Sequence, residues 1–301
     1  MKSEPILSAQ DITELRLQAN QLQGEITSSH KLDSREAGWL PTSAMGSGMD
    51  YAESRPYQQG DEPRTINWRL SARSTETYVK NYHMEARPSL CIVLDQRSTM
   101  MFGTRTRLKF TQALRLAIVL AFAAEQHRLQ LTIMLLNNSS EWLEFNSADS
   151  FLAGVNSCKL LQIDDRTVDN RGKIALVLEN LNEDIDKGSL VYLISDFRDL
   201  DKSHQKQLFQ LQANNFVQTM HIVDPAELNI ENKGGVALQD MLANALLMLE
   251  EDKFSEMKPN HALQQYNDNI KQTLLKSAVH YSLVSTTDEA LHSKIMFPLG
   301  H

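Results

Sequence analysis

Several classes of protein are excluded by what this 301-residue sequence has little of. Its two cysteines, Cys91 and Cys158, are too few for a disulfide framework and do not form a C-x-x-C pair. The longest wholly apolar run, which ends at Ala124, is less than half of the roughly 20 residues that a bilayer-spanning helix needs. The first residues, MKSEPILSAQDITELRLQ, lack the apolar stretch of a signal peptide. We therefore expect a cytoplasmic protein without membrane insertion.

Positive charge is also scarce, because 30 Lys and Arg stand against 38 Asp and Glu and the net charge is −8. An acidic chain argues against nucleic-acid binding, which favours basic domains. Residues 91–130 reverse this balance, with six Lys or Arg (Lys109 and Arg115 among them) and two acids. We interpret this segment as a solvated basic surface, and a nucleic-acid patch is the alternative.

Common catalytic motifs are absent as well. The chain has no G-x-S-x-G nucleophile motif and no Walker A loop, and Gly46-x-Gly48 lacks the third glycine of a dinucleotide fingerprint. The nine histidines are scattered without an H-E-x-x-H pair, and we expect His221, inside an apolar run, to be packed or solvated rather than to bind a metal.

What is present after residue 88 is an alternation of apolar runs with helical patterns. Strands are predicted at residues 89–95, 129–137, 141–145, 189–196, 216–224 and 280–286, and helices at 108–126, 147–157, 173–182, 202–213 and 262–276. This order predicts an α/β fold, with a mainly parallel sheet flanked by helices on both faces. The apolar run 238–249 falls outside the alternation and indicates either core packing or a partner-binding helix.

The first part of the chain has a different character. It contains a predicted amphipathic helix at residues 12–22, a polar and turn-rich region at 29–74, and a predicted strand at 77–84. We accordingly divide the chain into a polar, β-containing N-terminal segment, residues 1–87, and an α/β domain, residues 88–301.

Three of the predicted strands end in aspartate, at Asp95, Asp196 and Asp224. Their carboxyl ends should meet at one edge of the sheet, where ligands of open α/β sheets bind. The texts LDQRST at Asp95 and ISD at Asp196 resemble the Rossmann-type von Willebrand factor A fold and its metal-ion-dependent adhesion site. The resemblance implies that Asp95, Thr99 and Asp196 surround a divalent cation such as Mg²⁺ or Mn²⁺.

This chain departs from that pattern at one position. Arg97 occupies the place of the first hydroxyl ligand, and a guanidinium is a permanent cation without an acceptor atom. We expect Arg97 to replace the metal and to pair with Asp95 or Asp196, so that no cofactor is bound. A metal site at Asp95, Thr99 and Asp196 is the alternative.

A second resemblance rests on the stretch RPYQQGDEPRTINW and its flanks. The matching residues are Gly46, Gly48, Arg55, Tyr57, Gly60, Asp61, Arg64, Ile66, Trp68, Ser71, Ala72 and Arg73. Together with the strand ends at Asp95 and Asp196, they resemble the bacterial family called "domain of unknown function 58" over about residues 40–200. The resemblance implies an A-like domain that works with ATPases of the MoxR type, a AAA+ group, in chaperone-like or complex-assembly systems.

The polar stretch itself has two interpretations. In one, an exposed recognition surface binds a partner. In the other, the arginines form an ionic cluster on nearby carboxylates and the tryptophan is a buried anchor. Either interpretation uses the same residues, namely Arg55, Tyr57, Asp61, Arg64, Trp68, Arg73 and Arg97.

We therefore predict a non-enzymatic interaction or adaptor protein. The expected partner, implied by the family resemblance, is a MoxR-type AAA+ ATPase or the client that it remodels; nucleic acid is not expected. The rival hypothesis is a metal-dependent phosphoester hydrolase that uses Asp95 and Asp196.

Overall fold

The computed structural model describes residues 7–29, 50–58, 66–83, 89–136, 142–145, 147–156, 173–228 and 259–298. The chain divides into two compact units, one formed by Leu40–Arg87 and the other by Met1–Trp39 together with Pro88–His301. The N-terminal helix thus belongs to the larger unit, whereas the sequence pattern groups it with the polar N-terminal segment.

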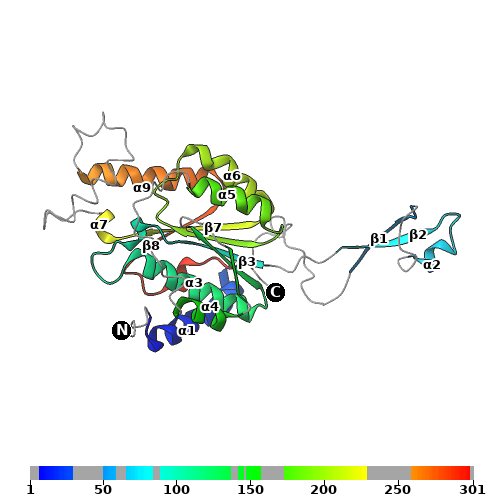
Figure 1. The fold of residues 1–301 in the computed structure, drawn as a ribbon, viewed down its shortest axis with the longest axis horizontal. Coiled ribbons are helices and arrows are strands. Elements are labelled where there is room, and N and C mark those ends of the chain that lie inside the picture. Colours follow the sequence, from blue (N-terminus) through cyan, green and yellow to red (C-terminus); the bar gives the residue numbers. More distant parts are fainter. Residues whose placement is uncertain are drawn as a thin grey trace. The chain divides into compact units, whose positions relative to one another are not determined.

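The larger unit is built on a six-stranded sheet in the order β5-β4-β3-β6-β7-β8 (Figure 1). Its strands are β3 (Ser89–Asp95), β4 (Gln130–Leu136), β5 (Trp142–Phe145), β6 (Leu190–Ser195), β7 (Phe216–Val223) and β8 (His280–Ser285). All neighbouring pairs are parallel except β4 and β5. The predicted α/β fold with a mainly parallel sheet is confirmed.

Helices cover both faces of this sheet (Figure 1). One face carries α1 (Ala9–Ser29), α3 (Lys109–Gln126) and α4 (Ala148–Asn156), and the other carries α5 (Lys173–Asp184), α6 (Gln205–Asn214) and α9 (Pro259–Lys276). The sequence of strand β3 is continuously apolar because both faces of the strand are buried. Ile92 and Leu94 pack into the first core, and Cys91 and Val93 pack into the second.

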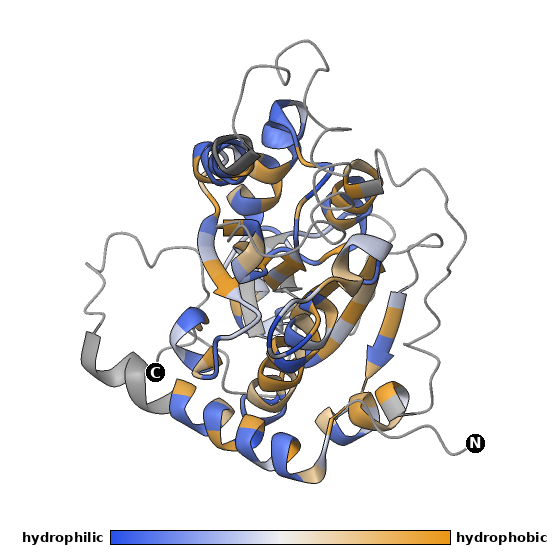
Figure 2. Cartoon of the chain, turned by 90° about the vertical axis from the view of Figure 1, so that its left-hand side faces the viewer, coloured by the Kyte–Doolittle hydropathy of each residue, from blue (hydrophilic) through white to orange (hydrophobic). Residues whose placement is uncertain are grey.

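Helix α3 lies at the centre of the first core. Its residues from Gln112 to Ala124 are all buried, because the sheet covers one side of the helix and α1 and α4 cover others. Leu15, Ala19 and Leu22 supply the buried face of α1. Figure 2 shows the result, with hydrophobic residues concentrated in the middle of the unit and hydrophilic residues on the outer sides of the helices.

Short helices connect these elements. They are η2 (Ser98–Met101), η4 (Lys202–His204), α7 (Pro225–Leu228) and η6 (Leu291–Lys294). Within the described ranges, no helix combines the length and the apolar composition that crossing a membrane requires. The apolar run 238–249 lies outside the described residues.

The smaller unit contains an antiparallel hairpin of β1 (Asp50–Pro56) and β2 (Tyr78–His83), with the one-turn helix α2 (Trp68–Ser71) between them in sequence (Figure 1). Strand β2 was predicted, but β1 was assigned to a turn-rich region, and that assignment is wrong. The sequence DYAESRP has no run of alternating apolar residues, so its extended form depends on backbone pairing with β2, which local pattern does not reveal.

Candidate functional site

Three carboxylates meet where the central strands end. Asp95 is the last residue of β3, Asp196 follows β6, and Asp224 follows β7. All three are buried. The parallel arrangement of these strands brings residues separated by about a hundred positions to the same sheet edge, as the sequence predicted.

Arg97 is bound to Asp95 by the predicted ion pair. Its Nη2 lies 2.7 Å from Asp95 Oδ2 and its Nε lies 3.0 Å from Oδ1. The backbone N–H of Arg97 also donates to Oδ1 at 2.9 Å, and the hydroxyl of Ser195 donates to Oδ2 at 2.6 Å. Both oxygens of Asp95 are therefore already engaged by protein donors.

The same guanidinium reaches two further carboxylates. Its Nη1 donates to Asp199 Oδ1 at 2.6 Å, and its Nη2 lies 3.9 Å from Asp196 Oδ1. The Arg97 side chain is only 2% exposed. Burial by itself would lower the pKa of Arg97, but the charges of Asp95, Asp199 and Asp196 raise it above its usual value. Arg97 is thus a fixed cation among three carboxylates.

A second buried cation, Lys109 at the start of α3, extends this arrangement. Its Nζ lies 2.8 Å from Asp196 Oδ2 and 2.9 Å from Glu227 Oε1. Arg198 completes it, because its Nη2 donates to Glu227 and its Nε lies 3.5 Å from Asp196 Oδ2. The ring of Tyr266 lies under the Arg198 guanidinium, 5.6 Å from its Cζ.

We call this set the ion network. Its members are Asp95, Arg97, Lys109, Asp196, Arg198, Asp199 and Glu227. Burial favours the neutral form of Asp196, but the charges of Lys109, Arg198 and Arg97 outweigh it and hold the pKa of Asp196 well below the usual range. Asp196 is therefore held ionised by the cations around it.

The sequence-based assignment of a solvated basic surface to residues 91–130 is wrong for three of its members. Arg97, Lys109 and Arg115 are buried, and each is paired with at least one acid from another segment. Arg115 joins α1 to the turn after β8 through Asp11 and Glu289, at 3.3 and 2.9 Å. Apart from Asp95, which is local to Arg97, these acids are supplied by tertiary contacts, so composition alone could not show that the cations are neutralised.

Asp224, at the same edge, is held by hydrogen bonds from neighbouring loops. It accepts hydrogen bonds from the backbone N–H and the hydroxyl of Thr104, from the hydroxyl of Thr286 at 2.9 Å, and from the N–H of Ala226 at 3.0 Å. Its own backbone N–H donates to Glu227 Oε2 at 2.9 Å. Asp224 therefore ties three loops together beside the ion network.

Of the two environments expected for His221, packed or solvated, the structure has the packed one. His221 is buried in β7, its Nδ1 is 3.1 Å from the hydroxyl of Tyr281, and its ring meets that of Phe197 edge-on. Burial lowers the pKa of His221 to about 3. The imidazole is neutral near pH 7.

The donor set at the edge does not fit the divalent cation that the resemblance implies. A cation needs carboxylate oxygens with free lone pairs, whereas Arg97 and Ser195 bind both oxygens of Asp95 and Lys109 binds Asp196. Thr99 Oγ1 is buried and, among the described residues, has no hydrogen-bond partner. In that same part of the chain, no group of three or more His, Cys, Asp or Glu is arranged to hold a metal.

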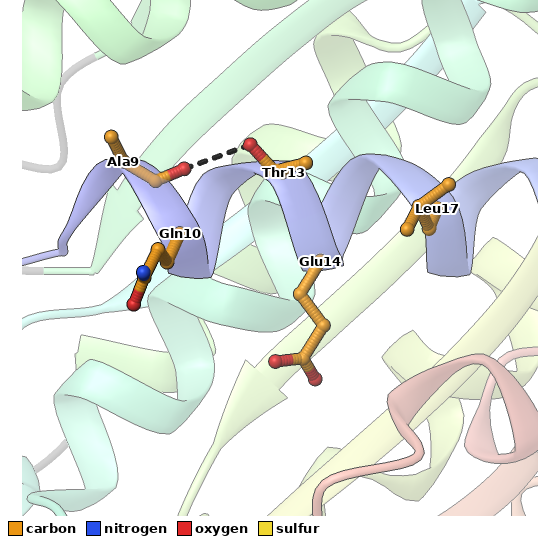
Figure 3. A pocket seen from close by; sticks show the side chains of 5 residues that line it. All are labelled: Ala9, Gln10, Thr13, Glu14 and Leu17. Atoms are coloured by element: carbon orange, nitrogen blue, oxygen red, sulfur yellow. Dashed lines mark hydrogen bonds between the residues drawn. The ribbon is translucent and has the colours of Figure 1, made fainter.

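Two hollows on the described surface lie away from the ion network. One is lined by Ala9, Gln10, Thr13, Glu14 and Leu17, which project from successive turns of α1 (Figure 3). A second lies on α9, between residues 264 and 272. Neither is lined by a member of the network, so neither places a substrate beside Asp95 or Asp196.

The structure tests only some of the predictions made for residues of the smaller unit. Trp68 was considered as a buried anchor, but it is 69% exposed, so that alternative is wrong. Tyr57 and Arg73 are exposed too. The backbone of Arg55 pairs with Val79 in the hairpin. Asp61 and Arg64, like the side chain of Arg55, lie outside the described residues, and the ionic cluster proposed for them stays a prediction.

Comparison with known proteins identifies the family of this chain. The family model described as "Protein of unknown function DUF58" matches residues 53–265, which is most of the chain. "Uncharacterized protein Rv1480" of Mycobacterium tuberculosis is 23% identical over 236 residues, covering 78% of this chain and 74% of that protein. "Uncharacterized protein Mb1516" of Mycobacterium bovis matches with the same identity and coverage.

Proposed function

The chain belongs to the DUF58 family, and we propose that it is a non-enzymatic interaction protein whose α/β unit has a von Willebrand factor A-like fold with an arginine in place of the metal. The observation that supports this proposal most directly is the contact set of Arg97. Its guanidinium binds Asp95 and Asp199 and lies beside Asp196, at the edge where the A-type fold holds its cation.

The ion network is unsuited to hydrolysis. A metal-dependent phosphoester hydrolase needs carboxylates that bind a metal ion, which in turn activates water. Here Asp95 is saturated by Arg97 and Ser195, and Asp196 is paired with Lys109. Each pair is buried, so releasing a carboxylate would leave an uncompensated charge in the interior.

The partner that we propose is a MoxR-type AAA+ ATPase or the client that such an ATPase remodels, in the cytoplasm and without nucleic acid. The family resemblance of the Arg55–Arg73 stretch is the ground for this partner. The acidic net charge of −8 supports the expectation that nucleic acid is not bound.

Two measurements test the proposal together. The full chain is co-expressed with a MoxR-type ATPase from the same genome, and size-exclusion chromatography asks whether the two elute as one complex. In parallel, the purified chain is assayed for hydrolysis of p-nitrophenyl phosphate and bis-(p-nitrophenyl) phosphate with Mg²⁺ and Mn²⁺. We expect a complex and no turnover above the buffer control. Metal-dependent turnover that disappears in Asp196→Asn would overturn the proposal and favour the hydrolase.

A further inference from the structure

Helix α2 is attached to the hairpin by two small polar side chains, Asn67 and Ser71. Asn67, its N-cap, accepts a hydrogen bond from the N–H of Leu70 at 3.2 Å and donates from Nδ2 to Ser54 Oγ at 2.9 Å. The hydroxyl of Ser71 accepts from the N–H of Tyr78 at 2.8 Å. Two polar side chains thus fasten one turn of helix to both strands of the hairpin.

This attachment leaves the large side chains of α2 facing solvent. Trp68 is 69% exposed and Leu70 is 38% exposed, while Tyr57, which follows β1, is 41% exposed. Among the residues of the smaller unit whose burial is described, only Val79 is buried. The apolar side chains of α2 therefore add little to the internal packing of the unit.

Two exposed arginines accompany these apolar groups. Arg69 lies between Trp68 and Leu70, and Arg73 follows one turn later. Glu76 is an exposed acid in the turn that leads to β2. Tryptophan, tyrosine and arginine are the residue types that contribute most binding energy at protein interfaces, and here they are held on a backbone fixed by hydrogen bonds.

We propose that Trp68, Arg69, Leu70 and Arg73 form a docking surface for a protein segment that carries carboxylates beside apolar side chains. The partner's apolar groups cover Trp68 and Leu70, and its carboxylates pair with Arg69 and Arg73. This inference deepens the proposed function, on which it rests, by assigning the contact to α2 and by stating the chemistry of the partner.

An acidic protein segment fits this surface better than a nucleic acid or a membrane does. Binding of a polynucleotide depends on many phosphate contacts, and the described part of α2 and its following turn offers two arginines on a chain of net charge −8. Membrane binding needs an amphipathic helix of several turns with a broad basic side, whereas α2 has four residues.

The test uses the full-length chain and two short synthetic peptides. In one, Asp and Glu alternate with Leu and Phe; in the other, Lys replaces each acid. Fluorescence anisotropy of the labelled peptides gives the dissociation constants. We expect the acidic peptide to bind at least about tenfold more tightly than the lysine peptide, and to lose about tenfold or more in Trp68→Ser and in Arg69→Glu.

Matched control variants distinguish binding at this surface from nonspecific binding elsewhere on the protein. Phe209 is 57% exposed on α6, and Arg128 is exposed after α3, so Phe209→Ser and Arg128→Glu should leave peptide binding unchanged. Equal weakening by Trp68→Ser and Phe209→Ser, or equal binding of the two peptides, would overturn the proposal. Trp68-dependent binding to anionic vesicles or to single-stranded DNA, without binding of the acidic peptide, would also overturn it.

The outcomes also distinguish this inference from the proposed function. If the ATPase co-elutes equally with the parent chain and with Trp68→Ser, and peptide binding fails, the docking surface is wrong while the function stands. If the acidic peptide binds through Trp68 but no ATPase complex forms, the docking surface stands and the proposed partner is wrong.

Discussion

Replacing Arg97 by serine should convert the ion network into a cation-dependent structure. The change removes a guanidinium that contacts Asp95 at 2.7 Å, Asp199 at 2.6 Å and Asp196 at 3.9 Å. It leaves three buried carboxylates with Lys109 and Arg198 as the nearby cations. It also introduces a hydroxyl at the position where the A-type pattern has one, two residues before Thr99.

The expected cost is large relative to the stability of a protein. Removing one partner of a buried ion pair destabilises by about 3–5 kcal/mol, and typical free energies of unfolding are about 5–15 kcal/mol. A cation that binds only the folded variant restores about 2.7 kcal/mol at a concentration one hundred times its dissociation constant. Arg97→Ser should therefore be strongly destabilised in EDTA and partly recovered by Mg²⁺ or Mn²⁺.

Urea unfolding followed by circular dichroism measures both effects. With a slope of about 3 kcal/mol per molar urea, the midpoint of Arg97→Ser should fall by about 1 M or more in EDTA. The parent chain should not respond to millimolar Mg²⁺, and Arg128→Ser, at an exposed arginine, should change stability by less than about 0.5 kcal/mol. A loss below about 1 kcal/mol in Arg97→Ser would refute the role assigned to Arg97, as would a parent chain that Mg²⁺ stabilises as much as the variant.

Three further predictions follow from the same contacts. Lys109→Met should cost about 3–5 kcal/mol in urea unfolding, because it leaves Asp196 and Glu227 without their shared cation, and adding Asp196→Asn should recover part of that loss. Since burial lowers the pKa of His221 to about 3, the unfolded chain binds one more proton between about pH 6.5 and that value. Stability should then fall by up to about 1.4 kcal/mol per pH unit as pH drops through this window, and urea unfolding at pH 7, 6 and 5 should show a smaller fall in His221→Phe. Asn67→Ala, which removes the cap of α2 and its bond to Ser54, should speed amide hydrogen exchange in α2 while the exchange of β3 and β6 stays unchanged.

The arrangement of the larger unit was predictable because its strands and helices carry their own patterns. The run at β3 is apolar on both faces of the strand, and the corresponding sheet is covered on both faces. Helix α3 is apolar nearly all round, and it is buried nearly all round. Where burial follows directly from composition in this way, local sequence and tertiary structure agree.

The ion network was predictable only in its local part. Asp95 and Arg97 are two residues apart, so their pairing follows from the strand end alone. Lys109 and Glu227 belong to distant segments, and nothing in either local sequence indicates that they share a contact of 2.9 Å. A lysine that opens a largely apolar helix was the available signal, since a charged residue there needs a partner if the helix start is buried.

The smaller unit reversed the usual expectation for aromatic residues. A tryptophan in a polar stretch was weighed as an anchor because large aromatic side chains are usually buried. Here Asn67 and Ser71 provide the attachment of α2 through hydrogen bonds, and Trp68 is left outside. Hydrogen-bonding side chains on the inner side of a one-turn helix therefore decided its orientation.

Because Arg97 is fully paired with internal carboxylates, the sheet edge is a poor site for binding a partner's acid. In the metal site that the resemblance implies, a cation retains open coordination positions that accept a partner's acid. Arg97 offers no equivalent, because its Nε, Nη1 and Nη2 each donate to Asp95 or Asp199 and its side chain is 2% exposed. A partner carboxylate would have to displace an internal one and leave it buried without a cation, at a cost of several kcal/mol. Recognition of acids through exposed arginines carries no such cost, and Arg69 and Arg73 beside Trp68 are placed for it. Under the proposed function, Arg97 therefore stabilises the sheet edge and does not bind the partner. The partner is bound instead by α2, through the exposed Trp68 and its neighbouring arginines.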